Sequence, residues 1–186
     1  ISHRFVLFPL SVHVGQATLP WLMAHDRPLY VTILEHRPPL SAWVVAAVQP
    51  LLGGDTIATV RILHLVTILA TIVLIYEVTR RLLNETAGVL AVIWFALLES
   101  IFVNIAFYFE VIQGLMYIGA AAVLLRPTVR RSSLFAAGVL LGAALLTKQQ
   151  AVVVIFWVLV WIGGRGRSLS RATIAGIGVL APLALV

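Results

Sequence analysis

The sequence contains no cysteine, which excludes disulfide bonds, thiolate metal sites and a thiol nucleophile. Charge is also scarce, because only 11% of the 186 residues are charged, whereas about 25% is usual in soluble domains. Acidic residues are the scarcest, at 7 against 13 lysines and arginines. The chain is 61% apolar, with a mean hydropathy of +1.06. A soluble domain of this size cannot bury so much apolar surface, so the composition predicts a membrane protein. It excludes a soluble enzyme, a disordered tail and a secreted disulfide scaffold.

Apolar segments divide the chain into a partial first span at residues 5–15, a loop at 16–60 and about six spans within 61–186. Several of these spans are shorter than the ~20 residues that a crossing needs, so tilt, a thin membrane or neighbouring helices must help. The expected fold class is all-α, a multi-pass transmembrane helical bundle in a single domain. Because the chain opens at Ile1 and stops inside an apolar run, we expect it to be the N-terminal part of a longer protein. The expected spans are 62–79, 86–106, 108–125, 132–147, 150–163 and 172–186.

The loop at 16–60 has a different composition, with five prolines and five charged residues. It also contains two apolar patches, at 17–23 and 40–52. This combination predicts an extramembrane loop with short amphipathic helices that lie at the membrane surface.

The basic residues indicate how the spans are oriented. If every span crosses the membrane, 9 of the 13 basic residues fall on one face, which the positive-inside rule makes the cytoplasmic one. These nine are Arg4, Arg80, Arg81, Arg126, Arg130, Arg131, Arg165, Arg167 and Arg171. The loop at 16–60 then lies on the non-cytoplasmic face, together with charges at the ends of several spans. On this interpretation the basic character marks membrane topology, and no nucleic-acid partner is expected.

Ionisable residues at the ends of spans are costly in hydrocarbon and are therefore candidates for function. Glu110 heads the span at 108–125, and Lys148 follows the span at 132–147, both on the face of the loop. The alternative is that these side chains simply reach the lipid headgroups. In the loop, Pro38 and Pro39 fix the chain beside a Glu-His-Arg cluster at 35–37, although an ordinary polar loop would have the same composition.

Two other features indicate structure. The small-xxx-small pattern 138-GVLLG-142 predicts close helix packing. His64 lies within a span and is interpreted as a hydrogen-bonded packing residue. The five histidines show no metal-ligand spacing, and the sequence requires no cofactor, although it leaves a divalent metal open.

The order of short motifs resembles membrane glycosyltransferases of the GT-C type. The nearest resemblance is to bacterial relatives of the protein O-mannosyltransferases and of the aminoarabinose transferase that modifies lipid A. A stretch at 107–125 resembles the family's helix headed by an acidic residue, here Glu110, and 138–151 resembles its Gly-x-x-x-Gly…Thr-Lys segment, ending at Lys148. The remaining motifs are 38-PPL-40, 53-GGD-55, 61-RI-62 and 76-YEVTRRL-82.

This resemblance implies an enzyme that transfers a sugar from a polyprenyl-phosphate donor to a lipid, glycan or protein acceptor on the non-cytoplasmic face. It implies a carboxylate base from the first outer loop, with Glu110 as a further acidic candidate. It implies that basic residues hold the donor phosphate, and Arg37, Arg61 and Lys148 are the candidates. The implied location is a bacterial inner (plasma) membrane, with the site facing the periplasm or the exterior.

One departure from the family pattern concerns the base. The family has an acidic residue where the first span ends, but Gly15 and Gln16 stand there, and Thr32 stands where many relatives have Asp. Asp26 and Glu35 are the carboxylates of residues 16–54 that can substitute. The rival function is a multi-pass transporter or an inactive membrane scaffold. A transporter favours mid-span charges, internal repeats and broken helices, whereas the charges here lie at span ends beside a large loop.

Overall fold

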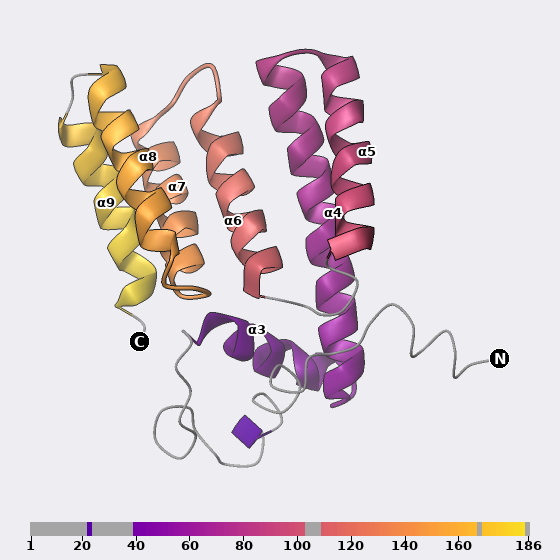
Figure 1. Cartoon of the computed structure of the whole chain (residues 1–186). Coiled ribbons are helices and arrows are strands. Elements are labelled where there is room, and N and C mark those ends of the chain that lie inside the picture. Colours follow the sequence, from indigo (N-terminus) through magenta and orange to yellow (C-terminus); the bar gives the residue numbers. More distant parts are fainter. Residues whose placement is uncertain (1–21, 24–38, 103–108, 167–168, 185–186) are drawn as a thin grey trace.

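Figure 1 shows the computed structural model of the chain, which describes residues 22–23, 39–102, 109–166 and 169–184. Within these ranges the ordered elements are all helices, and no strand is present, so the all-α prediction is confirmed. The elements are α3 (Leu40–Val48), the 3₁₀ helix η1 (Gln49–Leu52), α4 (Thr56–Leu82), α5 (Glu85–Phe102), α6 (Phe109–Leu124), α7 (Arg131–Leu145), α8 (Ala151–Gly166) and α9 (Leu169–Leu183).

The helices α4 to α9 run alternately up and down, and α3 lies across one end of them (Figure 1). We call this end the α3 end; it contains residues 39–55, 109–113 and 146–151. The opposite end, which we call the arginine end, contains the α4–α5, α6–α7 and α8–α9 connections. Arginines of this end that the structure describes are Arg80, Arg81, Arg126, Arg130, Arg131, Arg165 and Arg171. Arg4 and Arg167 lie outside the described residues. The alternation of helix directions on which the predicted orientation depends is therefore present.

Helix α4 is longer than predicted, because it begins at Thr56 and not near residue 62. The Asp55 side chain caps it: Oδ1 accepts hydrogen bonds from the backbone N–H of Ile57 (2.8 Å) and Ala58 (3.0 Å). Before the cap, Gly53 and Gly54 have φ of 78° and 83°, a left-handed conformation that glycine adopts without strain. These residues turn the chain from η1 into α4.

Among the described residues, one helix is long and apolar enough to cross a membrane by length and composition, and it is α4, with 27 residues. The helices α6 to α9 have 15 or 16 residues. At 1.5 Å per residue, 16 residues extend over about 24 Å, which is less than the ~30 Å of a typical hydrocarbon core. Their bounds differ from the predicted spans by a few residues, as helix ends commonly do.

Helices α7 and α9 approach most closely, and glycines permit the approach. A Cβ atom on Gly138 would overlap the carbonyl oxygen of Ala175 and lie 2.9 Å from Cα of Gly178. A Cβ atom on Gly142 would overlap the carbonyl oxygen of Val179. The prediction that 138–142 is a helix-packing motif is confirmed, and this interface belongs to the largest buried apolar cluster, which α6, α7, α8 and α9 share.

The buried and exposed faces of α4 have an unusual distribution of polarity. Its buried residues include a polar row of Thr56, Thr59, His64, Thr67 and Thr71. The hydroxyls of Thr59, Thr67 and Thr71 donate to backbone carbonyls four residues earlier, at 2.7–2.8 Å. From Ile57 to Val73 its exposed residues are all apolar, and they are Ile57, Ile62, Leu65, Val66, Leu69 and Val73. A helix with a polar buried face and an apolar exposed face suits a lipid environment better than water.

Candidate functional site

The α3 helix borders the candidate site and is attached to three of the bundle helices. The backbone N–H of Leu40 donates to the carbonyl oxygen of Leu146 at the end of α7, at 3.0 Å. In the middle of α3, Val45 is buried against Val60 of α4 and Ile112 of α6. Apolar residues of the 40–52 patch thus hold this part of the predicted loop against the bundle helices. The patch is helical, as expected (Figure 1).

The far end of α3 is fixed by a buried glutamine. Gln49 begins η1, and its Nε2 atom donates to the carbonyl oxygen of Gly54 at 2.8 Å. This hydrogen bond closes the turn that leads into the Asp55 cap. The aspartate of the 53–55 motif therefore has a structural task at the N-terminus of α4, which the pattern of a capping residue before an apolar run signals in the sequence.

Glu110 and Lys148, which are 38 residues apart in the sequence, form an ion pair at the α3 end. Glu110 stands in the first turn of α6, and Lys148 stands in the turn between α7 and α8. Gln113, one turn further along α6, donates from Nε2 to the backbone carbonyl of Lys148 at 3.2 Å. The neighbouring Thr147 is buried, and its hydroxyl donates to the carbonyl of Ala144 at 2.6 Å. Both the backbone and the side chain of Lys148 are therefore positioned.

The exposure of this pair indicates that it contributes little to folding. The side chain of Lys148 is 37% exposed and that of Glu110 is 52% exposed. Ion pairs at such positions contribute about 0–1 kcal/mol because water and salt screen them. An ammonium group that is half-exposed and held by a weak partner can exchange that partner for a phosphate oxygen. Such an exchange would leave the Glu110 carboxylate available.

Arg61 lies on the second turn of α4, directly after Val60 of the α3–α4–α6 cluster, and it is half-buried. Arg61 therefore lies near the end of the bundle that α3 crosses. The structure brings Glu110 and Lys148 into contact and places Arg61 at the same end of the bundle. The candidates Asp26, Glu35 and Arg37 lie outside the described residues. Sequence reasoning missed Gln113, because a glutamine inside an apolar span gives no indication of its distant partner.

Two cavities of this chain lie away from Glu110, Lys148 and Arg61. One, of about 360 Å³, is at the arginine end, and the other, of about 600 Å³, runs beside α6 and α8. Within the described parts of the chain, no group of three or more His, Asp or Glu side chains is placed to hold a metal ion.

Comparison with protein families gives one match, which covers residues 36–186 and therefore most of the chain. The matching family is described as dolichyl-phosphate-mannose-protein mannosyltransferase. The chain belongs to this family. Comparison with curated proteins and with solved structures gives no significant match.

Membership of the mannosyltransferase family confirms the GT-C resemblance and the prediction of a glycosyltransferase. The family is membrane-integral and of the mannosyltransferase type, which favours this class of function over the transporter alternative. The polar row on α4 and the apolar exposed faces agree with a membrane-integral family.

The limits of the mannosyltransferase match divide the candidate residues into two groups. Arg37, Arg61, Glu110 and Lys148 lie within the matched range, which begins at residue 36. Asp26 and Glu35 precede it, as do the Gly15 and Gln16 positions where the family pattern was found to differ. The matched range therefore includes the positions of the candidate phosphate-binding cations and of Glu110, and it excludes the two loop carboxylates.

Proposed function

We propose that this chain is part of a multi-pass membrane glycosyltransferase that takes a sugar from a polyprenyl-phosphate donor at its α3 end. The α3 end faces the non-cytoplasmic side, because the arginines gather at the opposite end. In a bacterial inner membrane this side is the periplasm. The acceptor is a lipid, glycan or protein hydroxyl. The observation that carries the proposal is the Glu110–Lys148 pair, held beside α3 in a chain of the mannosyltransferase family.

In this reaction the acceptor hydroxyl oxygen attacks the anomeric carbon of the sugar. The bond between that carbon and the phosphate oxygen breaks, and polyprenyl phosphate leaves with the electron pair. A carboxylate accepts the hydroxyl proton, and cations stabilise the leaving phosphate. Lys148 and Arg61 supply positive charge at the α3 end. Arg37 is three residues before Leu40, and three residues extend over at most about 11 Å, so the chain can bring Arg37 to the same end.

The proposed base is Asp26 or Glu35. Asp26 lies nearer the position at which the family has its acidic residue, whereas Glu35 stands beside Pro38 and Pro39. Glu110 is a third carboxylate of the site. It neutralises Lys148 in the absence of donor, and it is released when the donor phosphate takes its place.

The half-exposed setting of the pair supports an exchangeable partner for Lys148, because a fully buried pair would not exchange at low cost. The hydrogen bond from Leu40 to Leu146 holds this part of the predicted loop against a residue that is two positions before Lys148 in the chain. A loop carboxylate and the phosphate-binding lysine can therefore serve one site.

The test is transfer of labelled sugar from a polyprenyl-phosphate donor by the full-length protein. Asp26→Asn, Glu35→Gln and Glu110→Gln are measured separately, and a loss of ~100-fold or more in kcat identifies the base. Lys148→Gln should raise KM for the donor by about tenfold, because one charge-assisted contact with the phosphate is lost. Arg81→Gln, at the arginine end, removes the same charge and should leave both constants unchanged.

Full activity in all three carboxylate variants would refute the assignment of the base. An equal effect of Lys148→Gln and Arg81→Gln would refute a phosphate site at the α3 end. Lack of transfer by the unmutated protein with every donor would favour a non-catalytic membrane scaffold.

A further inference from the structure

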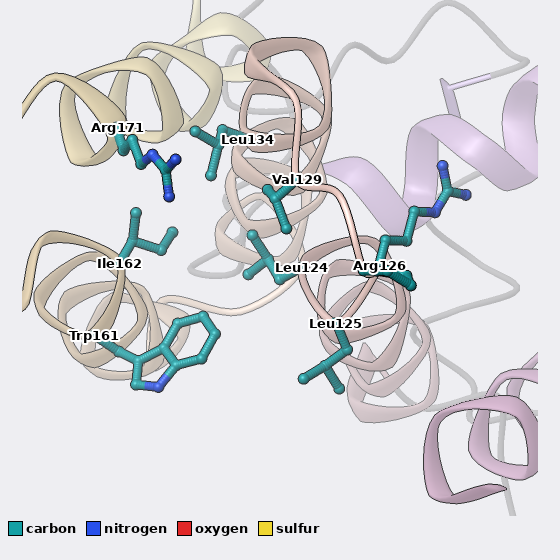
Figure 2. A pocket seen from close by; sticks show the side chains of 9 residues that line it. Leu124, Leu125, Arg126, Val129, Leu134, Trp161, Ile162 and Arg171 are labelled. Carbon is teal, nitrogen blue, oxygen red and sulfur yellow. The ribbon is translucent and has the colours of Figure 1, made fainter. Parts of the chain in front are cut away.

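The two cavities described above are neighbours, and we call them together the groove. The 360 Å³ cavity lies between the end of α6, the α6–α7 connection, α8 and α9 (Figure 2). The 600 Å³ cavity lies beside α6 and α8, further toward the middle of the bundle. Leu124, Leu125 and Trp161 line both cavities, so they share a wall. The groove therefore runs from the arginine end into the apolar part of the bundle.

The two parts of the groove differ in chemistry. The longer part is lined by apolar and aromatic residues, among them Ala121, Leu141 and Trp157. The part at the arginine end contains Arg171, whose guanidinium points into the space between Ile162 and Leu134 (Figure 2). Arg126 stands at the rim, and its guanidinium points away from that space (Figure 2).

Positive charge in this part of the groove is not neutralised by the protein within the described residues. Of the acidic residues near the arginine end, Glu77 bonds to Arg80 and Arg81 at 2.5–2.7 Å. Glu85 lies 3.4 Å from the Tyr76 hydroxyl, on the α4–α5 side of the bundle. Neither contributes to the lining of the groove.

We propose that this groove binds an anionic phospholipid from the leaflet at the arginine end. Its phosphate contacts Arg171, and one acyl chain lies along the apolar part between α6 and α8. Charge complementarity supports this occupant, since a basic pocket between membrane helices on the cytoplasmic side suits an anionic headgroup. The tryptophan on the shared wall suits the boundary between headgroup and chain. This site is separate from the proposed donor site, which lies at the other end of the bundle.

The test is lipid binding to the full-length protein, measured by native mass spectrometry. The protein is titrated separately with phosphatidylglycerol, with phosphatidylcholine of the same acyl chains and with polyprenyl phosphate. Phosphatidylglycerol should bind more tightly to the unmutated protein. Arg171→Gln should weaken its binding about fivefold, the effect expected of one arginine near an anionic lipid. Arg81→Gln removes the same charge from the same end but outside the groove, and it should change the affinity by less than about twofold.

A second variant tests the chain-binding part without altering charge. Ala121→Phe should fill the apolar groove and weaken phosphatidylglycerol binding, and its size-exclusion profile should match that of the unmutated protein. Ala136→Phe, on an exposed position of α7 that does not line either cavity, is the matched control. If Ala121→Phe fails to fold, the comparison of Arg171→Gln with Arg81→Gln still decides the matter.

Equal affinity for the two lipids would overturn the proposal, as would equal losses in Arg171→Gln and Arg81→Gln. Occupation of the groove by another helix of the full-length protein, seen as no binding of either lipid, would also overturn it. Binding of polyprenyl phosphate in place of phosphatidylglycerol would make the groove a donor site and overturn the assignment to phospholipid. None of these outcomes depends on sugar transfer, so the proposed function is tested separately.

Discussion

The contact between α7 and α9 predicts that one methyl group on Gly138 destabilises the bundle. In Gly138→Ala the new Cβ atom would meet the backbone carbonyl of Ala175 and lie 2.9 Å from Cα of Gly178. Backbone atoms of a helix cannot rotate away as a side chain can, so the two helices must move apart. Overpacking of this kind costs about 1–3 kcal/mol.

A second glycine-to-alanine change isolates this cost. Gly114 of α6 is also inside a helix, but a Cβ atom there would have no neighbour within 4 Å. Alanine has a higher helix propensity than glycine by ~1 kcal/mol, and both variants gain this amount. The difference between the two variants should therefore equal the overpacking cost, with Gly138→Ala less stable than Gly114→Ala by about 1–3 kcal/mol.

The assay is unfolding in mixed micelles with increasing SDS, followed by tryptophan fluorescence. Gly138→Ala should unfold at a lower SDS fraction than the unmutated protein, and Gly114→Ala at an equal or higher fraction. Equal unfolding midpoints for the two variants would refute the close approach of α7 and α9.

Three further predictions concern topology, the α4 cap and the ion pair. A cysteine replacing Leu51, which is 81% exposed at the α3 end, should react with a membrane-impermeant maleimide added from outside. A cysteine replacing Ser132 should react only from the cytoplasmic side, and labelling of both from the same side would contradict the topology. Asp55→Ala should lower the free energy of unfolding by about 1 kcal/mol and Asp55→Asn by less, because asparagine still caps; equal losses would contradict the cap. Lys148→Gln should lower it by less than about 1 kcal/mol, and a loss of several kcal/mol would show that the pair with Glu110 is structural.

Hydrophobic patterning predicts most of the fold, because helices that face lipid have long apolar runs in the sequence. The helices from α5 to α9 follow the expected order and lie within a few residues of the expected spans. Helix α4 begins earlier than predicted because Asp55, which falls within the predicted loop at 16–60, caps the helix. The buried threonine row can be predicted from the sequence, because Thr56, Thr67 and Thr71 recur at a spacing that places them on one face of a helix.

Less of the candidate site than of the fold can be predicted from the sequence. Patterning places Glu110 and Lys148 at the same end of the bundle, but their contact depends on how α6 packs against α7, and no local pattern encodes that register. Cavities cannot be predicted from the sequence pattern either, because they depend on side-chain packing. The two cavities described lie away from Glu110 and Lys148, one at the arginine end and the other beside α6 and α8.

The most direct test of the central claim, that the donor binds at the α3 end, is photo-crosslinking. A polyprenyl phosphate with a photoreactive group beside its phosphate is bound to the full-length protein, crosslinked and mapped by peptide mass spectrometry. Crosslinks that unlabelled polyprenyl phosphate competes away are predicted at residues 39–52, 109–113 or 146–151. Competed crosslinks confined to residues 125–131 and 169–171, at the arginine end, would contradict the account.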